Sequence, residues 1–127
     1  MYEISVEHTF ASGHALRGYR GKCEHVHGHN YRVKVMVAGE QLNSAGLLID
    51  FVELRAALQA ITEPFDHRML NDLPPFDQIN PSAENMAKHF CEALEPMVRA
   101  KGVRVRAVTV WETETSSATY RPATSLR

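Results

Sequence analysis

Residues 23–37 read CEHVHGHNYRVKVMV, a stretch in which a cluster of reactive side chains runs directly into a strand pattern. Alternate side chains of an extended chain share one face. His27 and His29 therefore share a face with the apolar residues that follow at the same spacing, which are Tyr31, Val33, Val35 and Val37. The pattern predicts a half-buried strand that presents two imidazoles to one ion at its beginning, with Gly28 allowing close approach.

A third metal ligand is expected from a neighbouring strand, and His14 is the leading candidate. It ends the segment Phe10-Ala11-Ser12-Gly13-His14, which follows the first strand pattern of the chain. Five of the seven histidines fall in the first quarter of the chain, next to a cysteine, and this clustering indicates metal binding more strongly than one His-x-His pair does. Three neutral imidazoles suit zinc, and an open fourth position makes such a site catalytic.

Strand patterns frame this segment at both ends of the chain. Alternation predicts a first strand over about residues 2–10, paired antiparallel with the strand of residues 31–37. Two more strands are expected over residues 103–111 and 118–121. His8 lies on the apolar side of the first strand, and we interpret it as a core histidine rather than a ligand.

Two helices are expected between these pairs of strands. Helical spacing predicts one helix from Phe51 to Ile61, capped by Asp50 and ended by Pro64. A second helix begins at the Ser82 cap, ends near Gly102, and buries the stripe Met86, Phe90, Ala93, Leu94 and Met97. The order ββααββ is that of an α+β protein, and we expect a single domain over residues 1–127 whose small core favours an oligomer.

Composition limits the kind of partner. The 127 residues are 44% hydrophobic and 23% charged with a net charge of -1, so nothing draws the chain to nucleic acid or to anionic membranes. Without a long apolar run or a signal peptide, the expected location is the cytoplasm. The two cysteines do not make a disulfide framework, and Cys91 within a helical pattern is expected in the core.

Two long connections carry the other polar candidates. Residues 11–26 include Arg17, Arg20 and Lys22, which could meet a phosphate, although simple solvation is the first expectation. The second connection begins with Asp66-His67 and suggests proton transfer, but adjacent side chains face one another only in an irregular loop.

Zinc bound by three imidazoles can hold two vicinal oxygens of a substrate and acidify the attached C–H bonds. Cys23, four residues before His27, can serve as the base, because a nearby dication lowers the pKa of a thiol. If Cys23 instead bound zinc, the site would be closed and the protein a non-catalytic, zinc-stabilised assembly module. The absence of CxxC pairs favours catalysis. Glu112 is solvated by default, or accepts two N–H bonds from a guanidine-like heterocycle if it is half-buried.

Taken together, the motifs resemble the family of 6-pyruvoyltetrahydropterin and 6-carboxytetrahydropterin synthases. The resemblance covers almost the whole chain and rests on His14, Cys23 with His27-Gly28-His29, Asp50-Phe51, Asp66-His67, Pro81-Ser82-Ala83-Glu84-Asn85 and Glu112-Thr113. It implies the tunnelling fold, in which an antiparallel sheet carries two helices on one face. It also implies that sheets close into a barrel within a trimer, and that two trimers form a hexamer.

The resemblance further implies roles for individual residues. One zinc ion per subunit would be held by His14, His27 and His29, and Cys23 would be the base. Asp66 and His67 would relay protons, and Glu112 would anchor the pterin ring, with Thr113 and Ser82 also contacting substrate. The substrate would be 7,8-dihydroneopterin triphosphate, and loss of triphosphate and acetaldehyde would give 6-carboxy-5,6,7,8-tetrahydropterin for queuosine synthesis.

Glu24 leaves a second outcome open. Cys-Glu-x-x-His-Gly-His resembles a subgroup that combines the cysteine with the glutamate of a folate-making branch. In that branch the product is 6-hydroxymethyl-7,8-dihydropterin, and the chain could make either product or both. Glu24 could equally be a loop carboxylate bonded to backbone. Ala83 departs from relatives that have a hydroxyl residue there.

Overall fold

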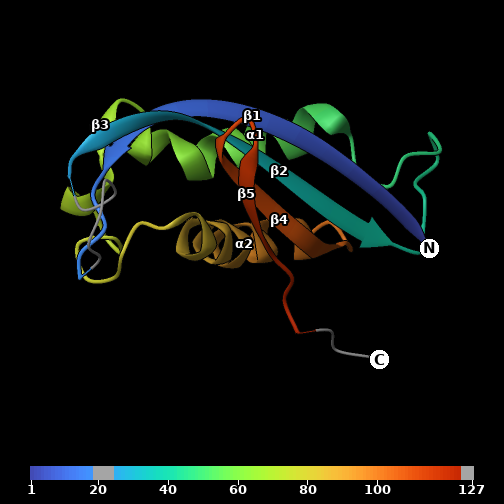
Figure 1. Ribbon diagram of the computed structural model, residues 1–127. Coiled ribbons are helices and arrows are strands. Elements are labelled where there is room, and N and C mark those ends of the chain that lie inside the picture. Colours follow the sequence, from blue (N-terminus) through green and yellow to red (C-terminus); the bar gives the residue numbers. More distant parts are fainter. Residues whose placement is uncertain (19–24, 124–127) are drawn as a thin grey trace.

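The computed structural model describes residues 1–18 and 25–123, which form one mixed sheet with helices on one of its faces (Figure 1). The strands are β1 (Tyr2–His14), β2 (His27–Gly39), β3 (Arg68–Met69), β4 (Arg104–Thr113) and β5 (Ser116–Tyr120). The helices are α1 (Phe51–Thr62) and α2 (Ala83–Arg99), with short 3-10 helices at Glu63–Phe65 and Leu70–Asp72. The spatial order is β3-β1-β2-β4-β5, which confirms the predicted α+β class and the order of the main elements.

The two longest strands, β1 and β2, pair as neighbours in the middle of the sheet. The two strands pair antiparallel from Tyr2 opposite Gly39 to His14 opposite His27, and they arch over the helices (Figure 1). The sequence pattern ended the first strand near residue 10, yet pairing with β2 continues it for four more residues. Gly13 and Gly28 face each other across this extension, where alternation of apolar side chains gives no signal.

Both helix caps were predicted and are confirmed. The Asp50 carboxylate accepts from the Val52 amide at 2.8 Å, and the Ser82 hydroxyl accepts from the Asn85 amide at 3.1 Å. Such caps satisfy amides that have no partner within the helix. The core lies between the helices and the inward residues of the central strands, and it includes Val33, Val35, Leu54, Leu58, Phe90 and Leu94.

One predicted core residue of α2 is wrong. Met97 is 41% exposed, whereas Val98 is buried. Pro96 lies inside the last turn of this helix. Because the stripe of buried residues passes from Leu94 to Val98, Met97 falls on the solvent side of a helix with 3.6 residues per turn.

The two-residue strand β3 brings the second long connection against the end of β1. Arg68 and Met69 pair parallel with Ser12 and Gly13. The buried Ser12 hydroxyl lies 2.6 Å from the Phe65 carbonyl oxygen and 2.8 Å from that of Arg68. This attachment fixes the Asp66-His67 pair beside the same end of the sheet as His14.

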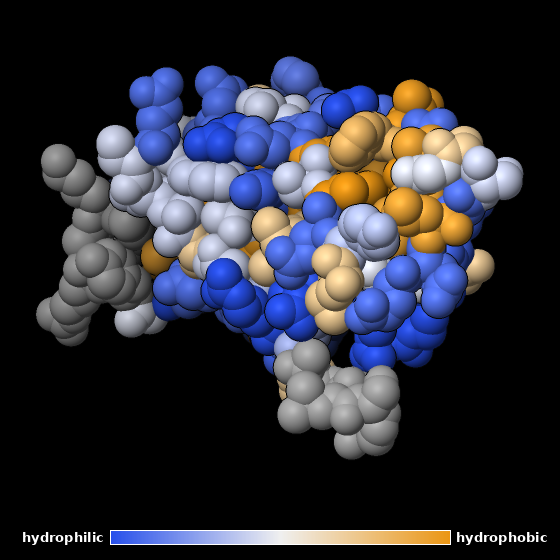
Figure 2. Space-filling model, turned by 90° about the vertical axis from the view of Figure 1, so that its right-hand side faces the viewer, coloured by the Kyte–Doolittle hydropathy of each residue, from blue (hydrophilic) through white to orange (hydrophobic). Residues whose placement is uncertain are grey.

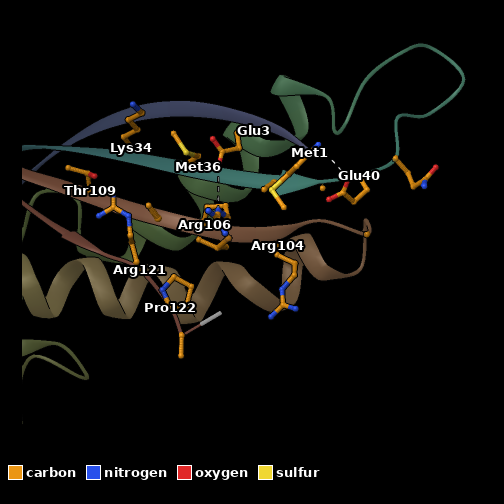
Figure 3. A pocket seen from close by; sticks show the side chains of 17 residues that line it. Met1, Glu3, Lys34, Met36, Glu40, Arg104, Arg106, Thr109, Arg121 and Pro122 are labelled. Carbon is orange, nitrogen blue, oxygen red and sulfur yellow. Dashed lines mark ion pairs between the residues drawn. The ribbon is translucent and has the colours of Figure 1, made fainter. Parts of the chain in front are cut away.

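The opposite face of the sheet is polar and hollowed. Lys34 and Met36 alternate with buried valines of β2 and so point away from the helices. They line a hollow of about 660 Å³ together with Arg106 and Arg121, and Figure 3 shows Arg106 paired with Glu3 there, at 3.3 Å. No described helix is long and apolar enough to cross a membrane.

Apolar side chains are also exposed at one end of the molecule. Figure 2 shows them gathered on the side that carries the N-terminus. The exposed apolar residues of the segments at this end are Met1, Tyr2, Leu42, Leu47, Phe51 and Val52. Such a patch is typical of a surface that contacts another protein chain.

Candidate metal centre

Three histidines from the two long strands converge at one end of the sheet. His14 faces His27 directly across the ladder, and His29 follows two residues later on the same face of β2. One ring nitrogen of each lies within 4.8 Å of the corresponding atoms of the other two. His14 is fully buried, and His27 and His29 are partly exposed. The structure thus gathers the three residues that the sequence analysis selected as ligands.

Main-chain carbonyl groups determine which nitrogens point into the centre. The Nδ1 atom of His14 lies 2.7 Å from the Pro81 carbonyl oxygen, and the Nδ1 atom of His27 lies 2.7 Å from that of His25. Because a carbonyl oxygen only accepts, each Nδ1 carries the hydrogen and donates it. In the neutral rings, the Nε2 atoms of His14 and His27 are then left with free lone pairs.

These two bare nitrogens lie 2.9 Å apart, so their lone pairs repel unless a cation lies between them. Two zinc–nitrogen bonds of about 2.0 Å at a tetrahedral angle would separate the nitrogens by about 3.3 Å. The Nε2 atom of His29 is buried without a hydrogen-bond partner among the described residues. Burial lowers the pKa of His14 and of His29, which favours the neutral imidazoles that bind metals. The donor set therefore fits a zinc ion.

Two further side chains complete the surroundings of the histidines. Glu112 on β4 places one carboxylate oxygen 3.4 Å from Nε2 of His14 and the other 3.8 Å from Nε2 of His29. The hydroxyl of Tyr31, a fully buried residue of β2, lies 2.9 Å from Nδ1 of His14. Sequence reasoning missed this contact of Tyr31, although the residue shares strand parity with His27 and His29. Burial and the charge of Glu112 both raise the pKa of Tyr31, so its hydroxyl keeps its proton.

Asp66 and His67 contact each other through their side chains despite being adjacent. His67 has the left-handed backbone angle φ of 59°, which is rare for a residue with a side chain. This turn brings its Nδ1 atom 3.0 Å from Oδ1 of Asp66. The same oxygen accepts from the Ala11 amide at 3.0 Å, and this bond, helped by His67, lowers the pKa of Asp66. The required loop geometry, left open by the sequence, is therefore present.

His67 also reaches the neighbourhood of the metal centre. It lines a shallow hollow of about 380 Å³ together with His29, Gly28 and Asn30. The side chain of His67 is 82% exposed. A ligand that enters this hollow can therefore meet both the candidate proton relay and one of the three clustered histidines.

The remaining predicted residues have mixed outcomes. Cys23 and Glu24 lie outside the described residues. Ser82 follows Pro81, whose carbonyl oxygen bonds His14, but its own hydroxyl caps α2. Thr113 ends β4 after Glu112, and its hydroxyl accepts from the Thr115 amide at 3.3 Å.

The fold and the site together define an α+β protein with three histidines at one end of its sheet, where they could hold a metal ion. Residues 3–123 match the family model described as 6-pyruvoyl tetrahydropterin synthase. The chain belongs to the 6-pyruvoyl tetrahydropterin synthase family, which confirms the resemblance drawn from its motifs. The prediction that it is an enzyme of the 6-carboxytetrahydropterin synthase type is confirmed by the named relatives that follow.

Relatives with two different names are similar to this chain. The chain is 34% identical over 125 residues to a 6-carboxy-5,6,7,8-tetrahydropterin synthase of Synechocystis, covering 94% of this chain and 93% of the relative. A Bacillus subtilis protein of the same name is 30% identical over 128 residues, covering 95% and 86%. The 6-pyruvoyl tetrahydrobiopterin synthase of Homo sapiens is 33% identical over 105 residues, covering 80% and 71%. The Caenorhabditis elegans 6-pyruvoyl tetrahydropterin synthase structure superposes with a TM-score of 0.81 at 26% identity, covering 97% and 98%.

Proposed function

We propose that this chain is a cytoplasmic, zinc-dependent lyase that converts 7,8-dihydroneopterin triphosphate to 6-carboxy-5,6,7,8-tetrahydropterin, a precursor of queuosine. The observation that carries the proposal is the meeting of the three histidines, whose carbonyl-bonded rings turn two bare nitrogens towards each other. The names of the Synechocystis and Bacillus subtilis relatives support the carboxy-forming reaction.

The protein residues divide the work of the reaction. A zinc ion held by His14, His27 and His29 would supply Lewis-acid polarisation of the substrate's side-chain hydroxyls. Cys23 would remove the proton from the adjacent carbon. Asp66 holds His67 at 3.0 Å, and this pair would pass protons between the substrate side chain and solvent, to which His67 is open.

Glu112 would anchor the pterin ring by accepting two N–H bonds from it. Its carboxylate is 26% exposed and lies beside the histidines, so an anchored ring would lie next to the centre. Thr113 and Ser82 would contribute further contacts to the bound substrate. Uptake of one water molecule, with release of triphosphate and acetaldehyde, would complete the reaction.

We further propose that the active protein is a hexamer made of two trimers, with one zinc ion per subunit. Among the described strands, β5 at one edge has no strand on its outer side. At the other edge, β3 and the part of β1 that precedes Ser12 have none either. Pairing of such edges between subunits would close a barrel and enclose the hollowed face seen in Figure 3. The exposed apolar patch at the N-terminal end (Figure 2) would supply a further contact surface.

The reaction is tested by incubating zinc-loaded protein with 7,8-dihydroneopterin triphosphate and identifying the pterin and the aldehyde by mass spectrometry. We expect 6-carboxy-5,6,7,8-tetrahydropterin and acetaldehyde. The His29→Ala variant, which loses one proposed ligand, should form neither product. If the wild-type protein leaves the substrate unchanged or converts it only as fast as this variant does, the proposed function is wrong.

A second candidate product is 6-hydroxymethyl-7,8-dihydropterin, which Glu24 next to Cys23 favours. Cleavage of the side chain in that reaction would release a phosphorylated glycolaldehyde instead of acetaldehyde. Cys23→Ala and Glu24→Ala should then lose different products. Unchanged yields of both products in Glu24→Ala would eliminate a role for this carboxylate.

A further inference from the structure

Arg17, which the sequence suggested as a possible contact for a phosphate, donates hydrogen bonds to main-chain carbonyl groups of the protein itself. One guanidinium nitrogen donates to the Phe76 oxygen at 2.8 Å and to the Asn71 oxygen at 3.2 Å, and the other donates to the Ile79 oxygen at 3.2 Å. A planar fork with five N–H donors can serve three separated acceptors, which the compact ammonium of lysine cannot do equally well. Arg17 therefore gathers residues 71–79 around its side chain.

Two asparagines attach the same loop to the main chain that follows β1. Asn71 accepts from the Ala15 amide at 2.9 Å and donates to the Ala15 oxygen at 2.8 Å. Asn80 accepts from the Arg17 amide at 2.7 Å and donates to the Arg17 oxygen at 2.8 Å. Each asparagine side chain thus bonds both the N–H and the C=O group of one residue, as a residue of a neighbouring strand would.

This attachment ends at the metal centre. Asn80 is followed by Pro81, whose carbonyl oxygen receives the hydrogen bond from Nδ1 of His14 at 2.7 Å. The main-chain carbonyl oxygen of Asn80 in turn accepts a hydrogen bond from the side-chain amide of Asn85, in the first turn of α2, at 2.8 Å. The position of the Pro81 oxygen is therefore set on one side by Arg17 and Asn80, and on the other by the start of α2.

We propose that Arg17 is a positioning residue for the metal centre, because it holds the loop whose Pro81 oxygen orients His14. The inference rests on the metal site of the proposed function. The hydrogen-bond partners of metal-binding histidines fix the tautomer and the ring orientation, and their loss weakens metal binding by about 10- to 100-fold. Arg17 acts one step further out, so Arg17→Ala should weaken zinc binding by about tenfold or less.

The global fold should tolerate this change. Arg17 is exposed, so water can replace its N–H groups on the released carbonyls. What is lost is the fixed position of residues 71–81. The amides of Asp77, Gln78 and Ile79, which bond to loop carbonyls at 3.0 to 3.1 Å, should therefore exchange faster with solvent.

The test compares Arg17→Ala, Arg17→Lys and Asn80→Ala with Arg55→Ala, which removes an exposed arginine from α1. Zinc affinity is measured by competition with a chelating dye, and amide exchange is followed over residues 71–80. We expect Arg17→Ala and Asn80→Ala to weaken zinc binding and to accelerate exchange in this loop. Arg17→Lys should recover only part of both effects, and Arg55→Ala should match the wild-type protein.

The opposite result has a distinct pattern. If Arg17 served a phosphate group, Arg17→Ala would raise KM, Arg17→Lys would restore it, and zinc affinity and loop exchange would equal those of Arg55→Ala. That outcome would overturn this inference and leave the proposed function intact. A wild-type protein that binds no zinc would overturn both.

Discussion

Replacement of Tyr31 by phenylalanine tests whether the hydroxyl group beside His14 contributes to the free energy of unfolding and to zinc affinity. The change removes one hydroxyl, 2.9 Å from Nδ1 of His14, and leaves a ring of nearly the same volume in place. That ring is fully buried and stacks on Phe10 with centroids 5.4 Å apart. Because the ring stays, the variant creates no large cavity, and the loss is confined to the polar contact.

The expected loss is at most that of one buried hydrogen bond, because the single Nδ1 hydrogen of His14 is shared between the Pro81 oxygen and the Tyr31 hydroxyl. Such a bond contributes about 0.5–1.5 kcal/mol net. A loss of about 1 kcal/mol lowers Tm by about 4 °C for a chain of this size. The Pro81 oxygen remains 2.7 Å from the same nitrogen, so the tautomer of His14 is retained. Zinc affinity should consequently fall by less than about tenfold.

Urea unfolding without metal measures the stability term, and dye competition measures zinc affinity. Tyr120→Phe is the matched control, because it also removes one phenol hydroxyl, from a partly buried ring on β5. Tyr31→Phe should be less stable than Tyr120→Phe and should bind zinc more weakly. Equal free energies of unfolding and equal zinc affinities in the two variants would refute the role assigned to the contact.

Two further predictions concern the proton relay and the half-buried His89. Asp66→Asn keeps an acceptor for the Ala11 amide but loses the charge beside His67. We therefore expect kcat to fall by about 10²- to 10⁴-fold, while zinc content and Tm stay nearly unchanged. A kcat within threefold of the wild-type value would exclude the relay. Burial lowers the pKa of His89 below its ordinary 6.5, so the unfolded chain takes up this proton at a higher pH than the folded protein does. The free energy of unfolding should thus fall as the pH decreases from about 7 to 5. In urea titrations, His89→Gln should make this fall smaller. Identical pH profiles of the wild-type protein and the variant would show that His89 does not cause the pH dependence.

The hairpin and its histidines could be predicted because period-two alternation is strong in both strands. Tyr31, Val33, Val35 and Val37 define the buried face, and extending their parity backwards places His29 and His27 on it. Antiparallel pairing then brings the end of β1 alongside. The caps of both helices could also be predicted, since Asp50 and Ser82 directly precede helical patterns.

The surroundings of the histidines could not be predicted in the same way. The Pro81 oxygen is a main-chain atom, and main-chain acceptors have no signature in the sequence. Glu112 meets His14 only because β4 lies next to β2 with Arg32 opposite Trp111, and strand order was not part of the sequence pattern. Arg17 looked like any loop arginine, because its acceptors lie more than 50 residues further along the chain.

X-ray absorption at the zinc edge of the resting wild-type protein tests the central claim most directly. An open site of three imidazoles predicts only nitrogen and oxygen neighbours at about 2.0–2.1 Å, with one zinc ion per chain. A sulfur neighbour at about 2.3 Å would mean that Cys23 binds the ion at rest, as in the non-catalytic assembly module, and would contradict the proposed chemistry.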